Sequence, residues 1–161
     1  MKPTAIIYSS NTGFTARYAA LLSAATGLPA YPLQEAERLK GARVIYLGWL
    51  MAGTVKDLGR ARRRYDLAAV IGVGLGAPEA QSVRKACRIP EETAVFTLQG
   101  GMDHSKLTGI YASMIRTLTT FLQKKKNRTP DEDEMLRLLM EGGDFVRAEN
   151  LHPVLAWFEM Q

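Results

Sequence analysis

The chain has 161 residues, of which 47% are hydrophobic, and its 21 Lys and Arg against 16 Asp and Glu give a formal net charge of +5. This length favours one domain with its own core, so we expect a single domain over residues 1–161. No apolar run is long enough to cross a membrane, and no apolar signal segment precedes the first predicted strand. We therefore expect a soluble, cytoplasmic protein.

The cysteine, histidine and basic residues exclude some classes of function. Cys87 is the only cysteine, which excludes an internal disulfide, and His104 and His152 are too far apart in sequence to indicate a metal cluster. Basic residues form short clusters at residues 60–64, 84–88 and 124–128. These clusters contain no nucleic-acid motif and no stacking aromatic residues, so we expect solvated helix faces and no nucleic-acid partner.

The first predicted strand leads into a loop rich in hydroxyl side chains. Residues 4–8 form a β-rich apolar run, which is typical of a parallel strand covered on both faces. Apolar residues then recur at helical spacing from Phe14 to Ala25, and Gly27 is placed to end that helix. The candidate cofactor-binding residues at this junction are Ser9, Ser10, Asn11, Thr12, Gly13, Phe14 and Thr15.

The start of this helix predicts an anion site. The first N–H groups of a helix have no partner within it, and the helix dipole places positive charge there, so a phosphate can bind without a Lys. A Walker loop needs a Lys after its second Gly, and a dinucleotide fingerprint needs a third spaced Gly; both are absent here. The alternative is that the hydroxyl residues only turn the chain and cap the helix.

Strand and helix patterns then alternate without a linker or a repeat. Further strands are expected at residues 29–33, 42–47, 67–73 and 93–98, with helices at 35–40, 55–64 and 79–88. This alternation predicts an α/β fold with a doubly wound, five-stranded parallel sheet of order 2-1-3-4-5. In such a sheet the ligand site lies outside the carboxyl ends of the strands.

The loop expected after the third strand combines large apolar residues with small ones. Its candidate cofactor-binding residues are Trp49, Leu50, Met51, Ala52 and Gly53. The large side chains can cover a flat cofactor ring, and Gly53 can allow its peptide to change its hydrogen bond. The alternative is that Trp49 packs in the core.

The loop expected after the fourth strand contains Gly74, Leu75 and Gly76, which we predict to bind the same cofactor. It superficially matches a dinucleotide fingerprint, but Pro78 and Glu79 stand where the third Gly is needed. A close approach of the backbone to the other side of the cofactor ring explains the glycines better.

Residues 106–123 follow a helical apolar repeat without a break, and the basic residues 124–128 come next. This segment is either the last helix packed on the sheet or a basic amphipathic helix that lies on an anionic membrane. We favour packing on the sheet, since most amphipathic helices in globular chains face a core. Additional C-terminal helices are expected from the N-cap Thr129 to near Gly142, and at residues 150–160.

Four segments together resemble the flavodoxin-domain family, which includes the flavodoxin-type protoporphyrinogen dehydrogenases. They are SSNTGFT at residues 9–15, GWLMAG at 48–53, VGLGAP at 73–78 and LQGGMDHSKL at 98–107. Residues 10–15 match, position by position, the loop that holds the phosphate of FMN in flavodoxins. The resemblance implies a flavodoxin-like fold, FMN as the cofactor and flavin redox chemistry.

We therefore predict an FMN-binding flavoprotein that carries out electron transfer, with no catalytic side chain and with a redox partner protein or a quinone as its partner. The second hypothesis is an oxidoreductase, an FMN-dependent protoporphyrinogen or quinone dehydrogenase, with a substrate cleft around residues 102–107. Peripheral membrane contact through residues 106–128 belongs to that hypothesis. The third is a flavodoxin-like interaction module without a cofactor, because Trp49 is the one obvious aromatic candidate for covering the ring.

Overall fold

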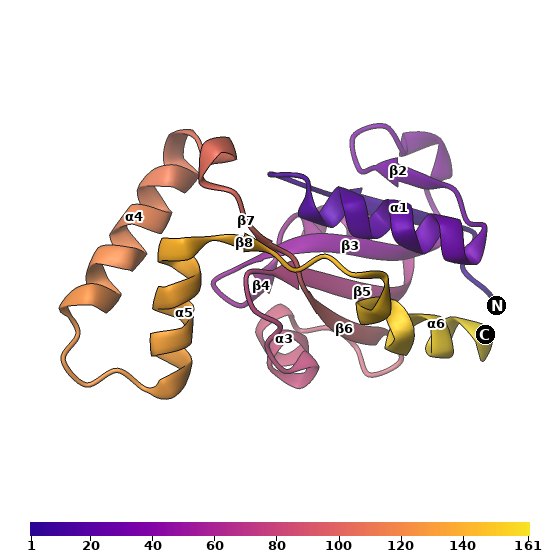
Figure 1. Ribbon diagram of the computed structural model, residues 1–161. Coiled ribbons are helices and arrows are strands. Elements are labelled where there is room, and N and C mark those ends of the chain that lie inside the picture. Colours follow the sequence, from indigo (N-terminus) through magenta and orange to yellow (C-terminus); the bar gives the residue numbers. More distant parts are fainter.

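The computed structural model describes residues 1–161 and contains a six-stranded sheet of order β2-β1-β3-β5-β6, with β4 paired to β3 outside this path (Figure 1). The strands are β1 Ala5–Ser9, β2 Ala30–Pro32, β3 Arg43–Met51, β4 Thr54–Val55, β5 Asp66–Gly74 and β6 Ala94–Gln99. All strand pairs of this sheet are parallel except β3 with β4. The predicted α/β class with a parallel sheet is confirmed.

The predicted strand order needs a correction. The chain forms an additional strand, β4, which returns antiparallel along the end of β3 after a turn at Ala52 and Gly53. Because β4 lies between the third and fourth parallel strands in sequence, the order is β2-β1-β3-β5-β6 and not 2-1-3-4-5. Pairing of β3 with β5 continues to Trp49, and β3 itself ends at Met51, so residues 48–51 belong to a strand and not to a loop.

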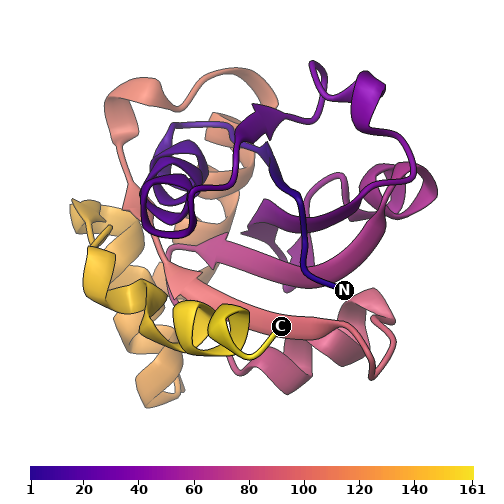
Figure 2. The ribbon, with the colours of Figure 1, turned by 90° about the vertical axis from the view of Figure 1, so that its right-hand side faces the viewer.

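Helices cover both faces of the sheet. They are α1 Phe14–Thr26, α2 Leu58–Arg64, α3 Ala80–Cys87 and α6 His152–Glu159, with a short 3-10 helix, η1, at Glu37–Leu39. Tyr18 of α1 and Val154 of α6 are buried with Ile6 on one face, whereas α2 and α3 pack around Ile7 on the other. The ribbon shows α1 and α6 together on one side of the sheet (Figure 2). The two isoleucines enter different cores because successive strand residues point to opposite faces.

A long insertion separates β6 from α6. Its elements are β7 Gly101–Met102, the 3-10 helix η2 His104–Lys106, α4 Gly109–Lys124, α5 Pro130–Glu141 and β8 Gly143–Asp144, followed by the 3-10 helix η3 Ala148–Leu151. β7 and β8 pair antiparallel, so the chain leaves the sheet and returns to it along one ribbon. Between them, α4 packs on α5 in a helical hairpin that projects from the end of the sheet (Figure 1).

The preferred interpretation of residues 106–123, the last helix packed on the sheet, is wrong. α4 packs on α5, and α6 takes the place beside α1 on the sheet. The start of α5 agrees with the prediction, since Thr129 Oγ1 accepts a hydrogen bond from the Glu132 N–H at 3.2 Å and Pro130 begins the helix. None of the helices combines the length and the hydrophobicity that crossing a bilayer requires.

Candidate functional site

The loop between β1 and α1 presents a row of unpaired backbone N–H groups. Gly13, the N-cap residue of α1, has φ 101° and makes no side-chain hydrogen bond to the first turn. The Ala16 N–H donates to Ser10 Oγ at 3.3 Å, and the Arg17 N–H donates to the Gly13 carbonyl at 3.0 Å. The N–H groups of residues 12–15 donate to no protein acceptor. Such a run of free donors at a helix N-terminus is a ready anion site.

Two part-buried polar contacts lie below this loop. The Ser9 hydroxyl donates to Asp57 Oδ2 at 3.1 Å, and the Tyr46 hydroxyl donates to the Lys56 carbonyl at 2.6 Å. Burial raises the pKa of Tyr46 above its ordinary value, so the phenol stays neutral. Ser9 is buried, and its hydroxyl is already hydrogen-bonded to the Asp57 carboxylate. Ser9 therefore supports the loop from below. The free donors lie further along, at residues 12–15.

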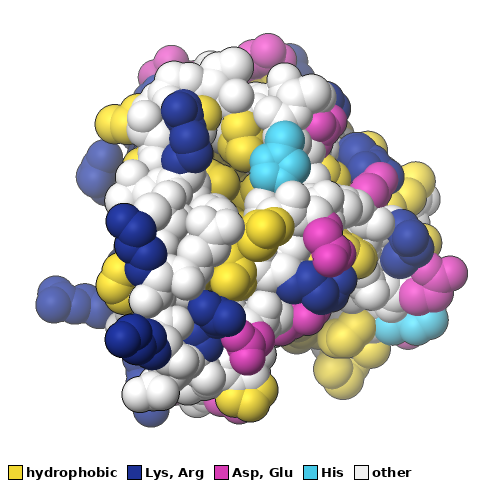
Figure 3. Space-filling view, turned by 60° about the vertical axis from the view of Figure 1, so that its left-hand side comes forward, with side chains coloured by type: hydrophobic (Ala, Val, Ile, Leu, Met, Phe, Trp, Pro, Cys, Tyr) yellow, Lys and Arg dark blue, Asp and Glu magenta, His cyan; other side chains and the backbone are white.

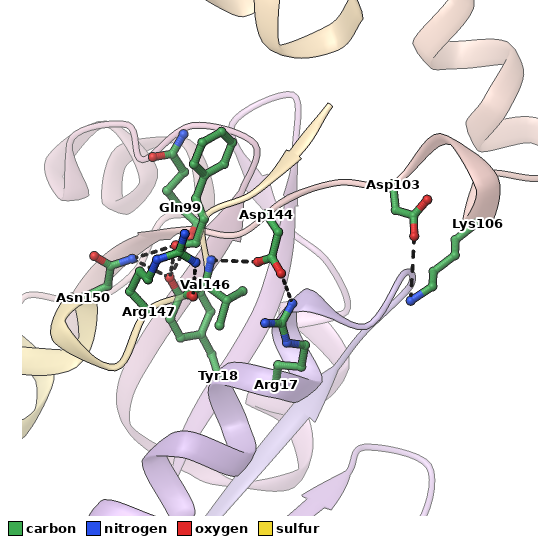
Figure 4. Close-up of polar contacts among 10 residues, drawn as sticks. Arg17, Tyr18, Gln99, Asp103, Lys106, Asp144, Val146, Arg147 and Asn150 are labelled. Atoms are coloured by element: carbon green, nitrogen blue, oxygen red, sulfur yellow. Dashed lines mark hydrogen bonds and ion pairs between the residues drawn. The ribbon is translucent and has the colours of Figure 1, made fainter. Parts of the chain in front are cut away.

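A cleft of about 540 Å³ opens beside these donors. Thr12, Gly13 and Arg17 line one side, and residues 102–106 with Asp144 of the insertion line the other. Arg17 Nη1 lies 2.7 Å from Asp144 Oδ2, so an ion pair joins α1 to β8 (Figure 4). The insertion therefore forms one wall of the candidate anion site.

The Arg17–Asp144 pair predicts a small pH effect on stability. The Arg17 guanidinium lowers the pKa of the Asp144 carboxyl below its ordinary value, and the Val146 N–H adds to this. A carboxyl with a lowered folded-state pKa stabilises the fold above its unfolded pKa, about 3.9, and this contribution disappears as the pH falls through the folded value. Both side chains are 50% exposed, so the effect is small.

Urea midpoints at about pH 6 and about pH 3 measure this effect. Wild type is expected to lose more stability between the two pH values than Arg17→Met, which lacks the pair. Arg38→Met removes an exposed cation that has no ion pair, and should behave like wild type. Equal losses in all three proteins would contradict a stabilising pair.

Three predicted segments meet at one edge of the sheet. β1, β3 and β5 are neighbouring parallel strands, with Ser9 opposite Gly48 and Trp49 opposite Val73. The chain after each of these strands therefore starts at the same edge. The sheet brings the loop at residues 9–15, the β3–β4 hairpin and the loop after β5 close together, as the sequence predicts.

Trp49 lies at this edge, outside both hydrophobic cores. Its half-buried ring packs edge-on against Tyr111 of α4, with centroids 5.1 Å apart and an interplanar angle of 85°. Lys56 Nζ lies 5.8 Å from the centroid of the Trp49 ring. The alternative that Trp49 packs in the core is therefore wrong. Tyr111 is a second aromatic residue at the edge, which the sequence showed only as one member of a helical repeat.

Leu50 has a different position from the one predicted. It packs against the core on the α2 and α3 face, and a Cβ at Gly72 would meet Leu50 Cδ2 at 2.8 Å. A Cβ at Gly74 would meet the Gly76 carbonyl oxygen at 2.8 Å and Leu50 Cδ1 at 3.1 Å. Gly72 is needed because a side chain there would collide with Leu50. Gly74 is needed because a side chain there would collide with the Gly76 carbonyl oxygen and with Leu50. Gly76 has open space at its Cβ position and remains a candidate for close approach of a ligand.

The turn between β3 and β4 contains two more of the predicted cofactor-binding residues, Ala52 and Gly53. Ala52 and Gly53 have φ of 50° and 76°, and Met51 pairs with Thr54 across the turn. Positive φ at both central positions is typical of a two-residue β-hairpin. The small side chains at this tip follow from hairpin geometry, and the peptide change predicted at Gly53 stays a prediction.

A second groove, of about 460 Å³, lies between α4 and α5. Leu107, Ile115 and Met140 supply its apolar lining, and Arg116 lies among the polar residues. Figure 3 shows hydrophobic side chains on this end of the molecule with Lys and Arg side chains around them. His104 lines both this groove and the cleft beside Gly13, so the two adjoin.

The chain matches no protein-family model, and no curated protein is significantly similar to it. The class defined by the fold and the site is an α/β protein with a parallel sheet and a candidate anion site at the carboxyl end of its first strand.

Proposed function

We propose that the chain is a flavodoxin-like redox protein that binds FMN at the carboxyl edge of the sheet. The four free N–H groups of residues 12–15 carry this proposal, because a phosphate monoester needs several converging donors. The resemblance of residues 9–15 to the flavodoxin loop is the reason to choose FMN among phosphorylated compounds with a flat ring.

The residues present fit both ends of FMN. Gly13 has open space at its Cβ position, Thr12 lines the cleft beside the free N–H groups, and Trp49 with Tyr111 offers an aromatic surface for the ring. Bound FMN would supply the electron chemistry, while the chain binds, orients and shields it from water. No side chain is required as an acid or base. A redox partner protein or a quinone would exchange the electrons.

Trp49→Ala is expected to weaken FMN binding about tenfold, because an aromatic contact contributes roughly 0.5–1.5 kcal/mol beyond buried area. Titration of FMN, followed by its fluorescence, measures the dissociation constant. Tyr31→Ala is the matched control, since Tyr31 is half-buried on β2 against Arg38. Equal weakening by both substitutions would contradict a ring site at Trp49.

A dehydrogenase acting on a porphyrinogen or a quinone is the second candidate. The groove between α4 and α5 favours it, because an apolar groove adjoining the cleft at Gly13 could admit a second, less polar compound. An enzyme of this kind would oxidise a porphyrinogen and pass its electrons and protons to a quinone analogue without a protein partner. Turnover with the analogue, lost in Met140→Arg at the groove, where Met140 is 56% exposed, would favour this candidate over electron transfer alone.

A further inference from the structure

α4 carries a row of large apolar side chains that the rest of the protein leaves exposed. Ile110, Met114, Leu118 and Phe121 are 70%, 43%, 41% and 61% exposed. Their spacing places them on one side of the helix. Leu122, on the neighbouring side, is buried. α4 is therefore apolar on two adjacent sides. The side with Leu122 is covered by the rest of the protein, and the side with the four exposed residues is not.

The stretch of chain that carries this row contains cations and no carboxylates. No Asp or Glu occurs between Asp103 and Asp131, a stretch that contains six cations: Lys106, Arg116, Lys124, Lys125, Lys126 and Arg128. Lys125 and Arg128 pair with carboxylates at the start of α5. Arg116, Lys124 and Lys126 pair with none. The exposed apolar row is thus accompanied by uncompensated positive charge.

We propose that this side of α4 docks on an anionic lipid bilayer. The four apolar side chains would enter the boundary between headgroups and acyl chains, and Lys124 at the end of α4 and Lys126 just after it would meet lipid phosphates. α4 is the outermost element at its end of the molecule, so a flat surface can reach it (Figure 1). The inference rests on the helix alone and does not depend on FMN binding.

Charge and size both disfavour a second copy of the chain as the occupant. α4 contains cations and no carboxylate, so pairing it with itself would bring like charges together. A stable protein interface buries about 800 Å² on each partner, from roughly 20–30 residues, whereas this row has four large side chains. A bilayer needs neither an acidic partner helix nor a matching pocket.

Cosedimentation of the purified protein with vesicles tests the proposal. We expect binding to vesicles of phosphatidylglycerol and phosphatidylcholine, and little binding to phosphatidylcholine alone. Binding should weaken at about 1 M salt, where the Debye length falls to about 3 Å. The double variant Ile110→Glu with Phe121→Glu should bind at least about tenfold more weakly, because it removes the two most exposed apolar groups of the row. Lys124→Glu should lose at least about fivefold.

Met160→Glu is the matched control, because Met160 is 77% exposed beyond α6 and α4 lies at the other end of the molecule (Figure 1). It should bind vesicles like wild type, and circular dichroism should show the same fold in every variant. No binding to anionic vesicles, or equal binding by the Ile110 and Phe121 variant, would overturn the proposal. A dimer that these two substitutions abolish, or capture of an acidic protein without vesicle binding, would overturn it as well.

Discussion

Thr12→Asp is expected to weaken FMN binding by about 100-fold, or roughly 2.7 kcal/mol, without weakening the fold. The new carboxylate would lie among the free N–H groups of residues 12–15, where it competes with a phosphate and repels it. A carboxylate at a helix N-terminus contributes about 0.3–1 kcal/mol of stability, so the free energy of unfolding should stay equal or rise. FMN titration and urea unfolding measure the two effects.

Thr120→Asp is the control for net charge. Thr120 is exposed on α4, so the same substitution there changes the charge equally but leaves the loop intact. It should bind FMN like wild type. Wild-type affinity in Thr12→Asp would contradict a phosphate site at this loop, and equal losses in both variants would indicate a general effect of charge. A loss of affinity with unchanged or increased stability separates ligand binding from a structural role.

Tyr18→Phe is expected to lower the free energy of unfolding by about 1–3 kcal/mol, because it removes a buried hydroxyl that connects three segments. Tyr18 is fully buried, and its hydroxyl donates to the Gln99 carbonyl at 2.6 Å. The same oxygen accepts from Asn150 Nδ2 at 2.7 Å (Figure 4). Since Gln99 ends β6 and Asn150 follows the return strand β8, this hydroxyl connects α1 to both ends of the insertion.

Urea unfolding measures the loss, with Tyr31→Phe as the control. Tyr31 is half-buried and its hydroxyl makes no hydrogen bond within the protein, so removing it should change stability by less than about 0.5 kcal/mol. Hydrogen exchange should also show faster exchange in β7 and β8 of Tyr18→Phe. Equal stability of the two variants would contradict the linking role of Tyr18.

The first strand and helix could be predicted because their signals are local. The strand expected at residues 4–8 lies at Ala5–Ser9, and the helix expected to begin at Phe14 and to end at Gly27 does so. The free N–H groups follow from that junction alone, because any helix start leaves them. The candidate anion site is therefore the part of the site that the sequence predicts best.

The edge of the sheet near Trp49 was harder to predict, because its structure depends on long-range contacts. Leu50 occupies space left by Gly72 on the neighbouring strand, and neither residue indicates the other in sequence. Tyr111 reaches Trp49 only because the β7–β8 ribbon and η2 place α4 there. A helical repeat also looks the same whether its apolar side meets a sheet or remains exposed, so the position of α4 could not be predicted from spacing.

Titration of FMN with purified wild-type protein tests most directly whether the loop of residues 9–15 binds FMN. The visible spectrum of the protein is recorded first, and flavin fluorescence is then followed as protein is added. We predict flavin absorption bands or one-to-one quenching, abolished by Thr12→Ala with Thr15→Ala. A colourless protein that leaves FMN fluorescence unchanged would contradict FMN binding and would favour an interaction module without a cofactor.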